Sequence, residues 1–349
     1  MTKLLKIEIA VLLVLVIVAI GIRVGDIHAP GDEILQDPGN TQPSVMVTEP
    51  TQPTVPAPTD PPPTTLPPTE PPVQPAFGED FAVEAKHWFA YHCGEERLLG
   101  ASDEVTEKIW PASVTKLFTA HVALKYLDTE KVIKIGTEVN MVAPDSSIAY
   151  IKPGHKLTVA QLVEGMLLPS GNDAAYALAV AAARAESGNS KMAAKEALAY
   201  FVELMNKESQ NLGMAGSHWA NPDGYHDFEH YTSIADLITI AKLALNNELI
   251  LQCAGTPADR VVYKSGEVAN WHNTNQLIHP ESQYYSPDAV GLKTGNTSYA
   301  GFSLLSAYKM DGEYIIVGAF KCQRPEDRFK SSLAVYEAVK EAYGFGEAE

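Results

Sequence analysis

Ser113 and Lys116 stand three residues apart in the stretch Trp110 to Thr119, and this pair could support covalent catalysis. A serine hydroxyl is a weak nucleophile until a base takes its proton, and a lysine becomes that base when burial or a nearby cation lowers its pKa. On a helix, residues i and i+3 share one face, so the amine can reach the hydroxyl. Alone, the pair is a weak signal, because two solvated side chains often have this spacing.

The helix that carries the pair is predicted to be buried in the middle of a domain. Pro111 suits its first turn, because proline has a helical φ and its missing N–H needs no partner there. The residues that follow are apolar on nearly every side: Leu117, Phe118, Ala120, Val122, Ala123, Leu124 and Leu127. Burial would lower the pKa of Lys116, and the helix start favours negative charge that develops beside Ser113.

The other elements place strands at both ends of a mostly helical region. A helix after the N-cap Thr158 should stop at the loop of Ser170 and Asn172, and Ser233 should cap another helix. The expected helices cover 157–168, 174–185, 191–212, 234–245 and 328–343. One or two strands are expected within 81–92, and further strands over 290–295, 302–308 and 314–320. This order predicts an α/β (α+β) fold, with one sheet assembled from both ends, packed on helices, and a helical insertion.

The composition narrows the class of partner. A formal net charge of −17 argues against a nucleic-acid partner and against adhesion to anionic lipid through basic residues. The three cysteines, Cys93, Cys253 and Cys322, are too few for a disulfide framework. One pair could form, and the sequence does not say which.

Two segments are expected to precede the globular domain of residues 78–349. Residues 1–27 hold two lysines and an apolar run from Ile9 to Ile22, which favours an uncleaved membrane anchor over a cleaved signal peptide. Residues 28–77 hold 15 of the 24 prolines and read as a disordered stalk. The domain is therefore expected on the extracytoplasmic face of the cell membrane, or in the cell wall if the signal is cleaved.

Three motifs now stand in order: Ser113-Val114-Thr115-Lys116, Ser170-Gly171-Asn172 and Lys293-Thr294-Gly295. They resemble the Ser-x-x-Lys, Ser-Asp-Asn and Lys-Thr-Gly motifs of the penicillin-interacting serine enzymes. Their flanks, with Asn221-Pro222-Asp223-Gly224 and Asn273-Thr274-Asn275, are similar to blocks of the low-molecular-mass serine D-alanyl-D-alanine carboxypeptidases. The resemblance covers about residues 78 to 345, and Gly171 departs from it where the motif has Asp.

The resemblance implies a β-lactamase/transpeptidase-like fold, with an antiparallel sheet flanked by helices and a helical subdomain. It implies a peptidoglycan stem peptide ending in D-Ala-D-Ala as substrate, β-lactam antibiotics as covalent inhibitors, and no cofactor or metal. Ser113 would form an acyl-enzyme with Lys116 as base, kept neutral by burial and by the nearby positive charge of Lys293. Ser170 would pass a proton to the leaving amine. Asn172 would orient Lys116 and the substrate amide, and the N–H groups of Ser113 and Asn296 would form the oxyanion hole.

The same resemblance implies where the substrate carboxylate binds. Lys293 and Thr294 suit its recognition, and Gly295 is expected to leave room for the substrate beside the strand edge. Arg328 aligns best with an arginine that the family uses near this site, and Arg324 competes for that role.

Other functions stay open on the sequence alone. A D,D-endopeptidase and a non-catalytic penicillin-binding sensor would both keep this fold. A class A β-lactamase would need a Glu-x-x-Leu-Asn loop, which the sequence lacks. His226 and His230 have the i, i+4 spacing of a zinc peptidase, but no third ligand block stands out.

Overall fold

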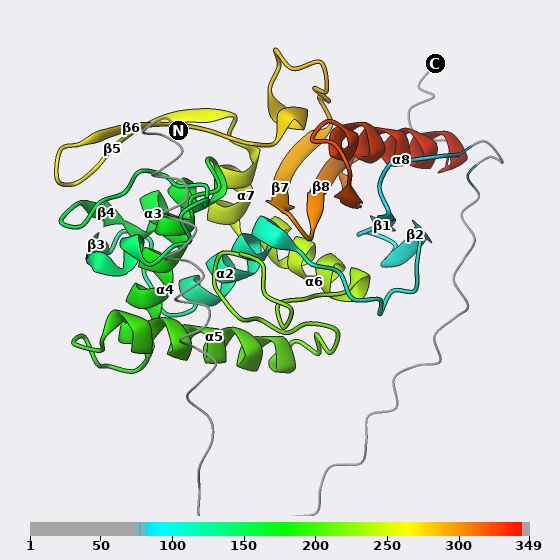
Figure 1. Cartoon of the computed structure of the whole chain (residues 1–349). Coiled ribbons are helices and arrows are strands. Elements are labelled where there is room, and N and C mark those ends of the chain that lie inside the picture. The colour runs from blue at the N-terminus through cyan, green and yellow to red at the C-terminus, as the bar shows by residue number, and fades with distance from the viewer. Residues whose placement is uncertain (1–76, 78–80, 344–349) are drawn as a thin grey trace, which may run out of the picture. The chain divides into compact units, whose positions relative to one another are not determined.

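The computed structural model describes Phe77 and residues 81–343, and its centre is a five-stranded antiparallel sheet (Figure 1). The strand order is β2-β1-β9-β8-β7. The strands are β1 (His87–His92), β2 (Arg97–Ala101), β7 (Ala289–Thr297), β8 (Gly301–Met310) and β9 (Glu313–Cys322). Because β1 pairs with β9, strands from both ends of the described chain share one sheet, which confirms the predicted fold class.

Both faces of the sheet are covered, because successive residues of its central strands enter different cores. Ile315 and Val317 of β9 join the cluster of α8 (Asp327–Tyr343), while Ile316 and Phe320 join the cluster of the helical region. On that second face α6 (Ile234–Leu245) packs against β8 and β9. Burial on both faces explains why these strands read as continuous apolar runs rather than as alternating ones.

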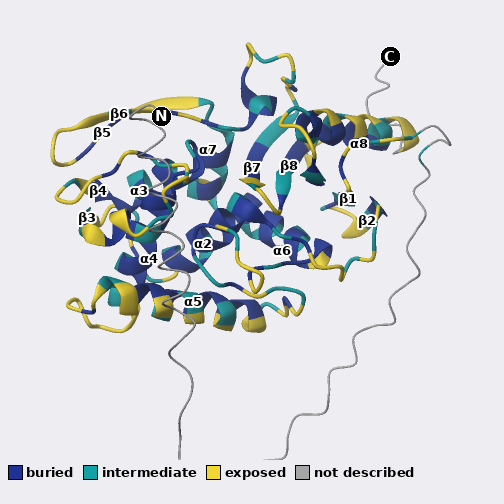
Figure 2. Cartoon of the chain, viewed as in Figure 1, coloured by how far each residue is buried: buried dark blue, intermediate teal, exposed yellow. Residues whose placement is uncertain are grey.

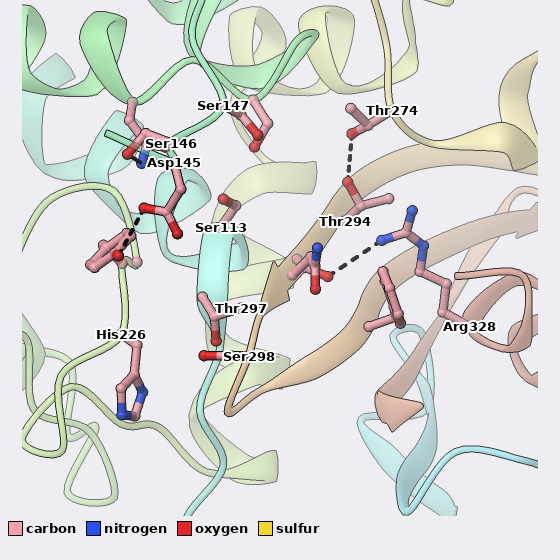
Figure 3. A pocket seen from close by; sticks show the side chains of 17 residues that line it. Ser113, Asp145, Ser146, Ser147, His226, Thr274, Thr294, Thr297, Ser298 and Arg328 are labelled. Carbon is pink, nitrogen blue, oxygen red and sulfur yellow. Dashed lines mark hydrogen bonds between the residues drawn. The ribbon is translucent and has the colours of Figure 1, made fainter. Parts of the chain in front are cut away.

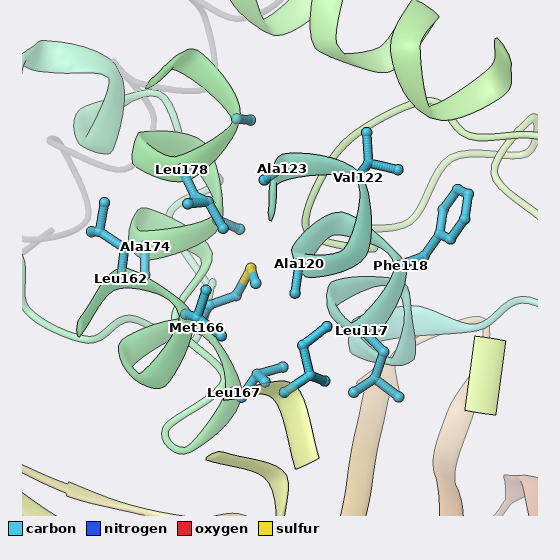
Figure 4. Packing of buried hydrophobic residues seen from close by; sticks show 14 of the residues in the cluster. Leu117, Phe118, Ala120, Val122, Ala123, Leu162, Met166, Leu167, Ala174 and Leu178 are labelled. Atoms are coloured by element: carbon cyan, nitrogen blue, oxygen red, sulfur yellow. The ribbon is translucent and has the colours of Figure 1, made fainter. Parts of the chain in front are cut away.

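The helical subdomain surrounds α2 (Thr115–Leu124), whose residues from Thr115 to Ala123 are all buried except His121 (Figure 2). Its apolar side chains pack against α3 (Val159–Leu167) and α4 (Asn172–Glu186), as Figure 4 shows, and α5 (Ala194–Asn211) lies against α4. The prediction of a helix buried in the middle of the domain is confirmed.

The capping residues set the helix starts as expected. Thr158 accepts a hydrogen bond from the Gln161 N–H, and the Gln161 side chain accepts one from the Thr158 N–H, which completes a capping box. Ser233 accepts a hydrogen bond from the Asp236 N–H at the start of α6. Each cap satisfies N–H groups that have no partner within the helix.

Several smaller elements differ from the sequence-based expectation. Residues 81–85 form no strand, so the segment 81–92 holds β1 alone. The remaining elements are β3 (Val132–Lys134), β4 (Lys156–Thr158), α7 (Glu248–Gly255), β5 (Ala258–Val262), β6 (Val268–His272) and the 3₁₀ turns η1 (Ala112–Val114), η2 (Thr137–Asn140) and η3 (Gln276–Ile278). Pairs β3–β4 and β5–β6 form two small antiparallel sheets.

The expected anchor, residues 1–27, and the expected stalk up to residue 76 lie outside the described residues. Among the residues that the structure does describe, no helix combines the length and the apolar character needed to cross a membrane.

Candidate active site

Ser113 lies on the 3₁₀ turn η1, which leads directly into α2. The sequence placed Pro111 in the first turn of an α-helix, but it precedes the 3₁₀ turn, and Ala112 takes a φ of 49°. The Thr115 hydroxyl donates to the Ala112 carbonyl at 2.8 Å, and His230 Nε2 lies 2.8 Å from that hydroxyl oxygen. Ser113 lies in this turn and Lys116 in the first turn of α2, and their i, i+3 spacing puts both side chains on one face.

The Lys116 side chain is fully buried, and its three donors reach three acceptors. Nζ lies 2.7 Å from Ser113 Oγ, 2.7 Å from Asn172 Oδ1 and 2.8 Å from the Asp223 carbonyl oxygen. Burial lowers the pKa of Lys116 to about 8, although the Asp223 and Asp173 carboxylates act against this shift. When Lys116 loses a proton, its lone pair can accept the Ser113 hydroxyl hydrogen, which is the geometry of a general base.

Ser170 and Asn172 stand where α3 gives way to α4. Asn172 Nδ2 donates to Ser146 Oγ at 2.9 Å while its oxygen faces Lys116, so the amide is fixed at both ends. Ser170 lines the same pocket and has a φ of 62°. A β-carbon on Gly171 would lie 2.6 Å from the Gly165 carbonyl oxygen, so packing explains why glycine replaces the motif's Asp.

Strand β7 supplies the third motif. Thr294, Gly295 and Asn296 line the pocket, while Lys293 is buried behind them and donates to the Thr294 carbonyl at 3.2 Å. Burial holds the pKa of Lys293 well below its usual range, and repulsion from Lys116 lowers it further. We expected the positive charge of Lys293 to help lower the pKa of Lys116, whereas burial is the dominant cause of that lowering.

The space beside Gly295 serves a different purpose from the one expected. A β-carbon there would lie 2.8 Å from the Pro111 carbonyl oxygen and 3.0 Å from Ala112 Cβ. The missing side chain therefore lets β7 pack directly against the turn of Ser113, rather than leaving room for a ligand. The same contact brings the Ser113 nitrogen alongside the strand, where the predicted oxyanion hole would form.

The positions of Arg328 and Arg324 decide which of them can bind the substrate carboxylate. Arg328 lines the pocket, and its Nη1 donates to the Gly295 carbonyl at 3.3 Å (Figure 3). Its Nε is buried without a hydrogen-bond partner among the described residues, and burial lowers the pKa of Arg328 to about 10. Arg324 is absent from the pocket lining and pairs with Asp327 instead.

The pocket has a volume of about 370 Å³, and several of its lining residues had no role in the sequence-based prediction. Asp145 and Tyr225 both line it, and the Tyr225 hydroxyl donates to Asp145 Oδ1 at 2.9 Å. Thr274 contacts the Thr294 hydroxyl. The one signal for Thr274 was its place in a family block, and no sequence pattern pairs Asp145 with Tyr225.

The two histidines considered as zinc ligands have different surroundings. His230 is buried, and Ala220 donates its N–H to His230 Nδ1 at 3.1 Å while Nε2 faces Thr115. His226 stacks on Tyr299 with ring centroids 3.8 Å apart. No group of three or more metal-binding side chains occurs within the described part of the chain.

A family model described as D-alanyl-D-alanine carboxypeptidase matches residues 73–321. The D-alanyl-D-alanine carboxypeptidase DacF of Bacillus subtilis is 30% identical over 225 residues, which is 64% of this chain and 54% of that protein. A Streptomyces D-alanyl-D-alanine carboxypeptidase is 33% identical over 213 residues, or 58% of this chain and 69% of that one. The chain thus spans about half the length of the Bacillus relative.

Solved structures share the fold. A Streptomyces DD-transpeptidase superposes with a TM-score of 0.66 at 27% identity, covering 75% of this chain and 98% of that one. The D-alanyl-D-alanine carboxypeptidase DacD from Francisella tularensis gives a TM-score of 0.63 at 23% identity, covering 77% and 73% of the two chains. These likenesses confirm the predicted antiparallel sheet flanked by helices.

Proposed function

Because this chain belongs to the D-alanyl-D-alanine carboxypeptidase family, we propose that it is a serine-type carboxypeptidase that removes the terminal D-Ala from peptidoglycan stem peptides. The observation that carries the proposal is the buried Lys116 amine, 2.7 Å from the Ser113 hydroxyl oxygen. A binding module with this fold would not need a lysine whose pKa is lowered beside a serine, so the contact favours an enzyme over a sensor.

In the proposed mechanism, neutral Lys116 takes the Ser113 proton as the hydroxyl oxygen attacks the carbonyl carbon of the penultimate D-Ala. The N–H groups of Ser113 and Asn296 stabilise the developing oxyanion. The tetrahedral intermediate collapses to an acyl-enzyme, and Ser170 passes its proton to the departing amine of the terminal D-Ala while the proton held by Lys116 replaces it on Ser170. Water then attacks the ester, which releases the shortened peptide and restores the Ser113 hydroxyl.

The terminal carboxylate is assigned to the end of the pocket that Arg328 and Thr294 line. The buried Arg328 Nε without a partner supports this assignment, since a carboxylate would supply the missing acceptor. Lys293 Nζ lies 3.4 Å from the Thr294 hydroxyl oxygen at the same end. A β-lactam, which carries a carboxylate beside a reactive amide, would acylate Ser113 in the same position.

The test is release of D-Ala from a diacyl-Lys-D-Ala-D-Ala peptide by the purified protein, with Ser113→Ala as the control. We expect release by the wild type alone, together with attachment of labelled penicillin to Ser113. Attachment of penicillin without release of D-Ala would contradict the carboxypeptidase. In that case, cleavage of a cross-linked dimer would identify a D,D-endopeptidase, and its absence a sensor.

We also propose that the domain is held at the extracytoplasmic face of the bacterial membrane by residues 1–27. The apolar run between Lys6 and Arg23 supports this placement, as does a substrate that lies outside the cytoplasm. Fractionation of cells that express the full chain tests it. Recovery of a shortened protein from the medium would show cleavage instead of anchoring.

A further inference from the structure

The charges of the active-site pocket lie at its two ends. Among the described residues that line it, Arg328 is the one arginine or lysine and Asp145 is the one carboxylate. Figure 3 shows them on opposite sides of Ser113, with Arg328 beside strand β7 and Asp145 on the loop before β4. The pocket therefore suits a ligand that is anionic at one end and cationic at the other.

Asp145 is held in place by contacts from separate parts of the chain. The Tyr225 hydroxyl donates to its Oδ1 at 2.9 Å, and the other carboxylate oxygen makes no hydrogen bond within the described residues. Further along the same loop, Ala149 and Ile151 donate their N–H groups to the carboxylate of Asp173 in α4, at 2.8 Å and 2.9 Å. The loop is thus tied to the first turn of α4, and an exposed carboxylate oxygen is presented at the rim.

The proposed function sets the direction in which the substrate peptide lies in the pocket, and this inference rests on that function. With the terminal carboxylate at Arg328 and the scissile bond at Ser113, the residue before D-Ala-D-Ala lies toward Asp145. In a stem peptide that residue is a diamino acid, whose side chain ends in an ammonium group unless it has been acylated. An ammonium within reach of Asp145 is attracted to it, whereas an amide is not.

We propose that Asp145, oriented by Tyr225, binds the free side-chain ammonium of the residue that precedes D-Ala-D-Ala. The protein then prefers stems whose amine is free over stems whose amine is acylated, as it is in a cross-link. Asp145 sets this preference through charge, and Tyr225 acts by positioning the carboxylate. The site thereby selects among stem peptides without any change at Ser113.

The experiment compares two peptides, Nα-acetyl-Lys-D-Ala-D-Ala with a free ε-amine and its Nα,Nε-diacetyl counterpart. For the wild type at low salt, we expect kcat/KM for D-Ala release to favour the free amine roughly three- to fivefold, as for an exposed ion pair. The ratio should fall to about one in Asp145→Asn and in 1 M salt, where the screening length is about 3 Å. Tyr225→Phe should reduce the ratio partially.

Asp311→Asn is the matched control, because it makes the same carboxylate-to-amide change in the β8–β9 turn, at the other end of β8 from the pocket residue Phe302. It should keep the wild-type ratio. Equal kcat/KM values for both peptides in the wild type would overturn the subsite and leave the carboxypeptidase standing. Release of D-Ala from neither peptide would overturn the proposed function and this inference with it.

Discussion

Lys116 Nζ and Ser113 Oγ lie 2.7 Å apart, across a 3₁₀ turn that ends where α2 begins. Lys116→Met keeps most of the buried volume and removes the base. We expect it to slow acylation of Ser113 by roughly 10²- to 10⁴-fold, the range for a positioned proton acceptor. Attachment of labelled penicillin over time measures this rate, and circular dichroism checks the fold. Acylation at the wild-type rate would refute the role of Lys116 as base.

The pH dependence of acylation follows from the lowered pKa of Lys116, about 8. The base acts when neutral, so kcat/KM should be low below this pKa and rise to a plateau above it. The Asp223 carboxylate raises the pKa of Lys116, so Asp223→Asn should move the midpoint to lower pH. Asp227→Asn, on the exposed part of the same loop, should leave it in place. A midpoint near the ordinary value of lysine would contradict burial as the cause.

Gly224 is expected to be essential because it touches the turn that carries Ser113. Its φ is 81°, and a β-carbon there would lie 1.8 Å from the Ala112 carbonyl oxygen. Gly266 has a φ of 102° with nothing within 4 Å of such a carbon. Gly266→Ala should therefore lower the free energy of unfolding by about 1–2 kcal/mol, from backbone strain alone. Gly224→Ala should lower the free energy of unfolding by about 1–3 kcal/mol more, through overpacking. It should also lose acylation of Ser113.

Denaturant unfolding of the two glycine variants measures this difference, with labelled penicillin as the readout for Ser113. Equal losses of stability in both variants would show that the turn near Ala112 moves to accept the extra carbon. The contact would then have no part in shaping the active site.

Removal of Arg328 should weaken recognition of the substrate carboxylate. We expect Arg328→Ala to lower kcat/KM for D-Ala release roughly ten- to a hundredfold, because a hydrogen bond to a charged group contributes about 1.5–3 kcal/mol. In the Arg328→Ala variant, replacing the terminal carboxylate of the peptide by an amide should cause little further loss of kcat/KM. Arg324→Ala, at an exposed position just before α8, is the matched control and should stay near wild type. Similar losses in both variants would refute the assignment.

The sequence predicted best what depends on local patterns. Thr158 and Ser233 cap their helices as expected, because a cap needs only a side chain and the next turn of backbone. The strands over 302–308 and 314–320 were found because each is a long apolar run beside the turn at Gly312. The three motifs likewise marked Ser113 before any geometry was known.

The rest depends on contacts between distant segments. Strand β5 buries only Val261, so its sequence shows no alternation, and its pairing with β6 could not be read from it. Asp145 and Tyr225 meet although the chain between them forms three helices. Gly295 was assigned to ligand space, because a sequence shows that a side chain is missing and not what fills the gap.

The pairing of β1 with β9 gives the protein a fixed order of maturation. Strand β1 is synthesised before the helical subdomain and β9 after it, so β1 waits for its neighbour while the chain between them is made. Sheets closed by such distant partners fold slowly, because the intervening chain must be ordered first. Strand β7, which packs against the turn of Ser113, joins the sheet through β8 and then β9. Until β9 is in place, β7 therefore lacks part of the sheet that holds it against the turn of Ser113.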